Sequence, residues 1–320
     1  MPERRILGTK RPIFIIGVVI LLALTVISFL AGALGQSFFG DIGLPSWLSV
    51  DSPHPELPAG EIFNIGGFVI TNTMFTAWLS ILLLGGFFYA ITRRIKLVPG
   101  RLQVVGEFIL GWLYNLCKDA AGEKNGRRFF PIVATLFLFV LVNAWMNLIP
   151  GFGSILITNS HGEAVHLLRG ANTDINMPLA LALVSFVAVE YWGFSSLGTG
   201  TYLKKFFNFG PFFRSLGKLL KGKVKEGGMG LFNGGVTIFV GILEFFLEFV
   251  RILSFTFRLF GNMTGGEILL LMMFFLMPLI GALPVYGLEL LVGFVQALIF
   301  GGLTLSFATV AVASHSEDEH

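Results

Sequence analysis

The sequence predicts an all-α integral membrane protein, and three observations carry that prediction. The chain has 320 residues, of which 54% are hydrophobic and only 13% are charged. Its mean hydropathy is +0.80, which leaves too little polar surface to cover a water-soluble globule. Apolar runs of about 20 residues, the length that crosses a bilayer as a helix, recur along the chain.

The composition also excludes several classes of protein. The net charge is +3 and the basic residues cluster beside the apolar runs, so no nucleic-acid partner is expected. Cys117 is the only cysteine, which excludes a disulfide within the chain. We find no zinc-ligand spacing, phosphate-binding loop or nucleophile motif, and therefore expect neither a metal nor a cofactor. His161 and His166 lie in a loop and are better explained as solvated side chains than as metal ligands.

The first predicted membrane helix is N-terminal and covers residues 13–34. It follows a short basic segment with Arg4, Arg5, Lys10 and Arg11. Ala31-Gly32-Ala33 resembles a signal-peptidase site, so residues 1–34 can also be read as a cleaved leader. We favour a retained helix, because the apolar part of a leader usually has only about 7–15 residues.

Three further spans are predicted at about residues 67–91, 129–148 and 177–197. Residues 35–66 form an extracytoplasmic loop before the second span, and an amphipathic stretch precedes the third. Segments 1–12, 92–128 and 198–233 together hold 19 of the 22 Lys and Arg residues. Basic residues mark cytoplasmic segments, so these three are expected on that side of the membrane. Arg169, in a loop predicted to lie outside, is an exception.

The C-terminal third of the sequence does not divide clearly into membrane spans. Residues 234–278 are nearly continuous and helix-compatible, and a helix of that length would be about 68 Å long, twice an upright span. Two short spans with a turn at Gly261-Asn262 or Gly265-Gly266 fit the pattern, and so does one long, strongly tilted helix. A last apolar stretch covers residues 286–313.

Charged and amide side chains interrupt this apolar region between residues 244 and 267. At about 100° per residue, five of these side chains fall within an arc of roughly 80° around a helix axis and so form one stripe along its surface. The stripe consists of Glu244, Glu248, Arg251, Arg258 and Asn262. Glu267 points away from Arg258 on the same helix. Each charge at a bilayer centre costs about 2.5–3.5 kcal/mol, so the stripe indicates function.

Four motifs resemble a known family in its own order. Arg258-Leu259-Phe260-Gly261-Asn262-Met263, followed by Gly266-Glu267, closely resembles the signature of subunit a of bacterial F-type rotary ATP synthases. The other three are Val98-Pro99-Gly100-x-x-Gln103-x-x-x-Glu107, Asp174-Ile175-Asn176 and Gln296-Ala297-Leu298-Ile299-Phe300. The matches cover about residues 60–313. The predicted span at 13–34 is an extra helix that the shorter members of the family lack.

The resemblance implies about six membrane helices in a bacterial inner (plasma) membrane, with both termini cytoplasmic. The membrane domain covers residues 67–320, and residues 234–313 form a long tilted hairpin against a ring of c subunits. Expected partners are the c ring, subunit b of the peripheral stalk and membrane lipid. Such a subunit has no catalytic chemistry of its own and couples the flow of H⁺ or Na⁺ to rotor rotation for ATP synthesis.

The family also implies roles for individual residues. Arg258 is the stator arginine that faces the rotor carboxylate, because a guanidinium stays charged at any cellular pH. It favours loss of the rotor proton and blocks leakage between two half-channels. Glu267 and Glu289 resemble the polar pair of the outer half-channel. Gln296 lies on the same helical face as Glu289, and Asn262 can position Arg258.

For three residues on the stripe, the sequence leaves two interpretations open. Arg251, Glu248 and Glu244 are candidates for the inner half-channel, but an internal ion pair explains them equally well. Glu190 and Asn147 are lone polar residues near span ends. An alternative function, a secondary ion-coupled transporter, usually shows inverted repeats, and we find none.

Overall fold

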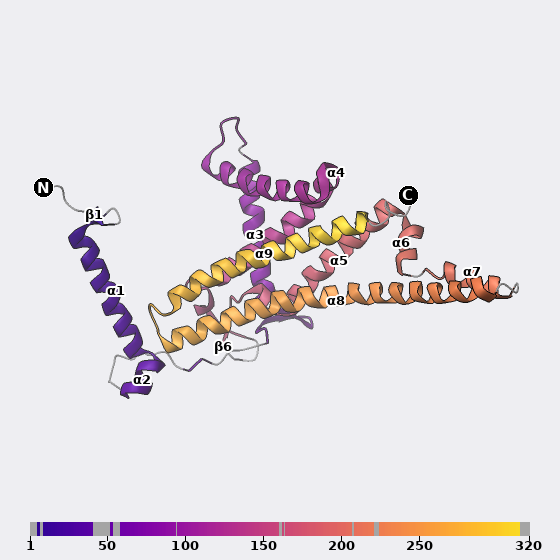
Figure 1. Ribbon diagram of the computed structural model, residues 1–320. Helices are drawn as coiled ribbons and strands as arrows, with labels where there is room; N and C mark the ends of the chain where they lie inside the picture. Colours follow the sequence, from indigo (N-terminus) through magenta and orange to yellow (C-terminus); the bar gives the residue numbers. More distant parts are fainter. Residues whose placement is uncertain are drawn as a thin grey trace. The chain divides into compact units, whose positions relative to one another are not determined.

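Helices dominate the computed structural model, which describes residues 5–6, 9–40, 52–53, 58–93, 95–159, 162, 164–206, 208–220 and 224–313. Figure 1 traces the elements in chain order. The strands in the described residues form short antiparallel hairpins: β1 (Arg5–Ile6) with β2 (Thr9–Lys10), β3 (Glu61–Ile65) with β4 (Phe68–Thr71), and β5 (Leu156–Thr158) with β6 (Ala164–His166). The predicted all-α class is confirmed.

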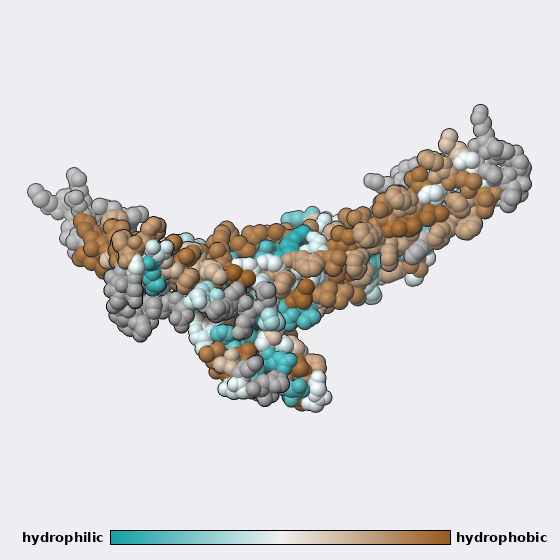
Figure 2. All heavy atoms as spheres, turned by 90° about the horizontal axis from the view of Figure 1, so that it is seen from below, coloured by the Kyte–Doolittle hydropathy of each residue, from teal (hydrophilic) through white to brown (hydrophobic). Residues whose placement is uncertain are grey.

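Five of the described helices are long and apolar enough to cross a membrane. They are α1 (Arg11–Ala31), α3 (Asn72–Thr92), α4 (Arg101–Asn147), α5 (Asn176–Leu197) and α9 (Ala282–Ala313). Many of their apolar side chains are exposed, and Figure 2 shows hydrophobic residues over most of the face that it displays. Such exposure is expected where lipid rather than water surrounds the helices.

The second span begins later than expected, at Asn72 instead of residue 67. The reason is the β3–β4 hairpin, whose turn is made by Gly66 and Gly67 with φ of 60° and 90°. Glycine adopts positive φ without steric cost, and two such residues make the tight turn that joins antiparallel strands. The backbone N–H of Gly67 also donates to the Asn64 side chain at 3.1 Å.

Helix α4 consists of two helical segments that meet at Gly122, where φ is 76°. Gly126 lies against the backbone of Cys117 and Lys118, so a side chain at 126 would prevent the close approach. The ring centroids of Trp112, in the first segment, and Phe137, in the second, are 5.7 Å apart, and the rings meet edge to face. The amphipathic stretch and the third span of the sequence prediction are thus packed against each other.

Helix α8 (Val224–Leu276) is one continuous helix of 53 residues. Neither Gly261-Asn262 nor Gly265-Gly266 forms a turn, so the structure has one long helix in place of two short spans. The basic segment before α8 contains α6 (Thr199–Phe206) and α7 (Gly210–Leu220). Short elements α2 (Ala33–Phe39), η1 (Phe152–Ser154) and η2 (Ala171–Thr173) complete the described secondary structure.

The chain divides into two compact units. Unit 1 contains Met1–Phe75, Ala144–Thr173 and Gly261–Phe294, and unit 2 contains Thr76–Asn143, Asp174–Phe260 and Val295–His320. The core of unit 2 is formed by α4, α5 and α9 and includes Phe129 and Trp192, whose ring centroids are 4.5 Å apart. In unit 1, the end of α1 packs against the turn after α8: the Ser28 hydroxyl donates to the Pro278 carbonyl, and Gly32 lies against the Leu276 backbone.

Candidate functional site

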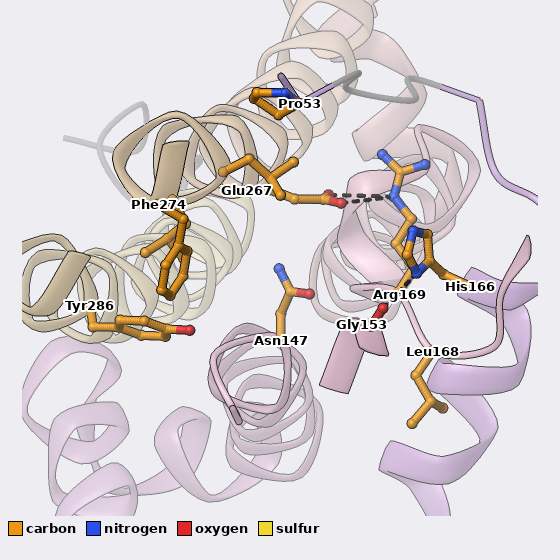
Figure 3. A pocket seen from close by; sticks show the side chains of 11 residues that line it. Pro53, Asn147, Gly153, His166, Leu168, Arg169, Glu267, Phe274 and Tyr286 are labelled. Atoms are coloured by element: carbon orange, nitrogen blue, oxygen red, sulfur yellow. Dashed lines mark hydrogen bonds and ion pairs between the residues drawn. The ribbon is translucent and has the colours of Figure 1, made fainter. Parts of the chain in front are cut away.

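A cavity of about 360 Å³ in unit 1 gathers polar side chains from segments far apart in the sequence. Figure 3 shows Glu267 of α8 and Arg169, which follows β6, pointing toward each other beside Asn147 and Tyr286. The Arg169 Nε lies 3.2 Å from Oε1 and 3.4 Å from Oε2 of Glu267. The remaining lining residues are Pro53, Gly153, His166, Leu168, Leu270, Leu271 and Phe274. The arrangement is a partly buried ion pair at the edge of a cavity that can hold water.

Local structure holds Arg169 in this position. Its Nη1 donates to the Pro58 carbonyl at 2.8 Å. The next residue, Gly170, lies close to the Asn147 side chain, where a Cβ would come within 3.0 Å of it. The Thr173 hydroxyl donates to the Gly170 carbonyl at 2.8 Å and closes the turn. The Arg169 side chain is 9% exposed and that of Glu267 is 25% exposed.

The second predicted acid, Glu289 of α9, lies in the same unit. Its carboxylate faces Gly266 of α8, at a place where any side chain on residue 266 would collide with it. Gly266 immediately precedes Glu267 in α8. Glu289 therefore contacts α8 at the residue next to Glu267, the acid with which the sequence pairs it. Asn262 also lies on α8 in this unit and is exposed.

A groove of about 430 Å³ lies between α8 and α9 in unit 2. Its polar lining comes from the predicted stripe: Glu248, Arg251, Ser254 and Arg258. The apolar wall consists of Leu247, Val250, Phe255, Leu303, Phe307, Val310 and Ala311. The structure therefore confirms that Glu248, Arg251 and Arg258 share one face of α8.

Arg251 is neutralised within this unit. Its Nη2 lies 3.7 Å from Oε1 of Glu190 on α5, and it forms a second ion pair with Glu248, one turn earlier on α8. The internal ion pair that the sequence left as an alternative is thus present. Glu190, which appeared from sequence to be a lone polar residue, is part of it.

Arg258 has different surroundings. It is partly exposed, and its Nη2 donates to the Ser254 hydroxyl at 3.3 Å. Within the part of the chain that the structure describes, no carboxylate pairs with it. A permanent charge without a resident counter-charge at the side of a groove can attract a carboxylate from outside the chain.

The remaining predicted residues are placed as follows. Glu244 is half-buried on α8 outside the groove lining, and Gln296 of α9 is buried in unit 2. His166 donates through Nδ1 to the Gly153 carbonyl, and His161 lies outside the described residues. No group of three or more potential metal ligands occurs among the residues that were described. Sequence reasoning missed the role of Arg169, although its position as the lone basic residue of the outer segments was a signal.

Comparisons with known proteins give one consistent family. The model of a family described as ATP synthase A chain matches residues 74–309. An ATP synthase subunit a from Gloeobacter violaceus is 32% identical over 78% of this chain and 86% of its own length. The subunit a of Moorella thermoacetica is 30% identical over 80% of this chain and 97% of its own. An ATP synthase subunit a 1 from Pelobacter propionicus is 33% identical over 72% and 82%, respectively.

Proposed function

Because the chain belongs to the ATP synthase A chain family, we propose that Arg258 is the charge that meets the carboxylates of the rotating c ring. Family membership makes the chain the proton-conducting stator subunit of F0, a multi-pass membrane protein without a catalytic site of its own. It also decides against a secondary transporter. Membership of the family implies association with the b and c subunits of F0. The individual contacts with these subunits are proposed.

The observation that carries the proposal is the difference in charge balance among three arginines. Arg169 pairs with Glu267 and Arg251 pairs with two glutamates. Arg258, in contrast, makes no ion pair within the described residues and borders a groove. A rotor carboxylate that arrives at Arg258 is stabilised in its charged form, so its proton leaves. Coulomb attraction at about 4 Å and an effective dielectric of about 20 amounts to roughly 4 kcal/mol.

Protons reach and leave this charge along separate routes. The outer half-channel passes through the cavity with Arg169, Glu267 and Asn147, and Glu289 against Gly266 extends it. The inner half-channel uses the groove with Glu248 and Arg251, with Glu244 on the same stripe. Arg258 separates the two routes because a proton that crossed directly would have to pass a fixed positive charge. Asn262 and Gln296 hydrogen-bond water along these routes.

The orientation in the membrane follows from the basic segments. Segments 1–12, 92–128 and 198–233 face the cytoplasm, and the N- and C-termini lie there too. Helices α8 and α9 form a tilted hairpin against the c ring, because α8 is far longer than an upright span. Subunit b of the peripheral stalk keeps the chain stationary. The transported ion is H⁺, and a sodium-driven rotor would be recognised by Na⁺ stimulation of transport.

The test is Arg258→Ala in the assembled ATP synthase. ATP-driven acidification of inverted vesicles should disappear, because neither release of the rotor proton nor separation of the half-channels remains. Passive proton uptake, measured after removal of the soluble motor, should persist or rise. Arg258→Lys should not restore coupling, since an ammonium lacks the planar fork and loses its proton more easily on desolvation.

Arg128→Ala is the matched control. Arg128 of α4 donates to Ser196 at 3.0 Å outside the groove, so its loss should leave pumping near the wild-type level. Normal ATP-driven pumping by a correctly assembled Arg258→Ala complex would falsify the proposal.

A further inference from the structure

Asn72, the first residue of α3, is a buried polar residue whose hydrogen bonds join three segments of unit 1. It is 2% exposed. Its Oδ1 accepts hydrogen bonds from the backbone N–H groups of Thr73 at 2.9 Å and Gly60 at 3.1 Å. Its Nδ2 donates to the His166 carbonyl at 3.1 Å, and its own backbone N–H donates to the Gly60 carbonyl at 3.0 Å. The start of α3, the residue before β3 and the end of β6 are therefore tied together by one residue.

The residue before β3 also packs closely against β6. A Cβ on Gly60 would lie 2.3 Å from Cγ1 of Val165, the residue that precedes His166. Val165 is 8% exposed. Only a residue without a side chain leaves room for Val165 at this place. One polar and one apolar contact thus hold the same two segments together.

The two segments that Asn72 joins are those that hold Arg169. The Pro58 carbonyl, two residues before Gly60, accepts from Nη1 of Arg169 at 2.8 Å. Arg169 itself follows His166 by three residues. Two or three residues span at most about 7–11 Å, so a shift where the segments join moves the arginine or its acceptor. Asn72 therefore fixes the position from which Arg169 reaches Glu267.

The joined segments contribute one wall of the outer cavity. In Figure 3, Gly153, His166 and Leu168 lie on the same side of the cavity as Arg169. The His166 side chain bonds the Gly153 carbonyl and so ties this wall together. Glu267 faces the wall from α8. Asn72 is not one of the described residues that line the cavity, so it acts on the cavity through the segments that it joins.

The ion pair depends on the exact place of the wall. An arginine favours the charged form of a carboxylate when the two groups lie within about 4–6 Å. The Arg169 Nε lies 3.2 Å from the Glu267 carboxylate. Without the Asn72 amide, the His166 carbonyl and the Gly60 N–H lose these hydrogen bonds, and buried backbone groups are costly to leave without partners. The wall would shift to find other partners and would carry the guanidinium away from the carboxylate.

We propose that Asn72 is a positioning residue of the outer half-channel, which holds Arg169 on Glu267 by joining the Gly60 segment to β6. The inference rests on the proposed function, in which protons enter through this cavity. During ATP synthesis a proton passes from outer water through cavity water to Glu267, and only O–H bonds form and break. Asn72 takes part in no proton transfer, but it sets how readily Glu267 exchanges its proton.

The test is Asn72→Ser in the whole complex. Serine keeps a side-chain oxygen that can cap α3, but its side chain is too short to bridge Gly60 and His166. ATP synthesis by vesicles under an imposed proton gradient should fall by about tenfold, a change typical of one lost buried hydrogen bond. The dependence of synthesis on outer-side pH should change in the same direction as in Arg169→Met.

Asn64→Ser is the matched control. Asn64 of β3 is exposed and accepts from the Gly67 backbone N–H at 3.1 Å in the β3–β4 turn. The same substitution there removes a side-chain amide from the same hairpin without touching the joined segments. Asn64→Ser should therefore keep the wild-type rate of synthesis and the wild-type pH profile.

The double variant Arg169→Met/Asn72→Ser separates positioning from a general structural role. If Asn72 acts through Arg169, adding Asn72→Ser to Arg169→Met should change synthesis by less than about twofold and leave its pH profile as it is. A purely structural role would lower synthesis by the same factor in both backgrounds. That additive result, or wild-type synthesis and pH profile in Asn72→Ser alone, would overturn the inference.

If Asn72→Ser does not assemble, Gly60→Ala decides, because its methyl group would collide with Val165 and displace the same two segments. Synthesis should fall, and Val165→Ala in the same chain should restore most of it by removing the colliding Cγ1 atom. Wild-type synthesis in Gly60→Ala, or no recovery in Gly60→Ala/Val165→Ala, would then count against the inference. Arg258→Ala is measured in parallel: normal pumping there contradicts the proposed function, whereas loss of pumping there with wild-type behaviour of Asn72→Ser contradicts this inference alone.

Discussion

Replacing Arg169 by Met tests whether the ion pair in the outer cavity serves proton entry. The substitution keeps an unbranched side chain of similar length and removes only the charge and its hydrogen bonds. Glu267 then faces the cavity without the guanidinium that lies 3.2 Å away in the wild-type chain. The Pro58 carbonyl also loses its 2.8 Å hydrogen bond. The Glu267 carboxylate would therefore be partly buried without a counter-charge.

The size of the effect follows from distance and burial. At 3.2 Å and an effective dielectric of about 20, the gross attraction is roughly 5 kcal/mol, and desolvation of both groups offsets part of it. Breaking a buried pair on one side typically costs about 3–5 kcal/mol. The Glu267 side chain is 25% exposed, so water screens part of its charge. We expect a cost of about 2–3 kcal/mol, or roughly 30- to 150-fold in an equilibrium constant.

The assay is ATP synthesis by vesicles under an imposed proton gradient, together with thermal stability of the purified complex. Arg169→Met should lower both, because the stranded carboxylate disfavours the native cavity. The double variant Arg169→Met/Glu267→Gln removes the stranded charge, so it should recover stability while synthesis stays slow. Arg128→Met is the control for loss of a basic side chain elsewhere. Stability losses that simply add in the double variant, with no coupling between the two sites, would refute the reasoning.

The other predictions concern Glu289 and the N-terminal helix. Glu289→Gln should slow ion-driven ATP synthesis while leaving assembly intact, because the substitution keeps the shape that fits against Gly266 but removes the exchangeable proton. Normal proton conduction by Glu267→Gln/Glu289→Gln membranes would exclude both acids from the outer half-channel. Intact mass of the purified subunit should include residues 1–33, since the end of α1 packs on the turn after α8; a mature chain that begins at Leu34 would establish the leader interpretation.

The long helix α8 shows where sequence patterns reach their limit. Gly261-Asn262 and Gly265-Gly266 are turn signals in an aqueous protein. In a membrane, however, a break in the helix leaves backbone N–H and C=O groups without water, so continuing the helix is favoured. Gly266 is instead used for the close approach of Glu289. The sequence correctly predicted an apolar helix that carries charged side chains here. Whether that helix continues without a break depends on the membrane environment and on the contact with α9.

Arg169 illustrates a contact that local patterns do not contain. Helical periodicity relates residues within a few turns and therefore brought Glu248, Arg251 and Arg258 together correctly. Arg169 and Glu267 are separated by 98 positions, and their pairing depends on how the β5–β6 hairpin and the turn at Gly170 pack in unit 1. Glu190 was missed as a partner of Arg251 for the same reason, since α5 and α8 are separate helices.

The local sequence explains why Arg258, unlike Arg251, makes no ion pair within the described residues. On a helix, an arginine most readily pairs with an acid three or four residues away. The residues at those distances from Arg258 are Ser254, Phe255, Gly261 and Asn262, and none is acidic. Arg251 has Glu248 at such a distance and is neutralised by it. A resident carboxylate would already satisfy the guanidinium and would compete with each rotor carboxylate that arrives. An acid introduced at residue 254, as in Ser254→Glu, should therefore block pumping although Arg258 itself is unchanged, and near-normal ATP-driven acidification by that variant would contradict this account.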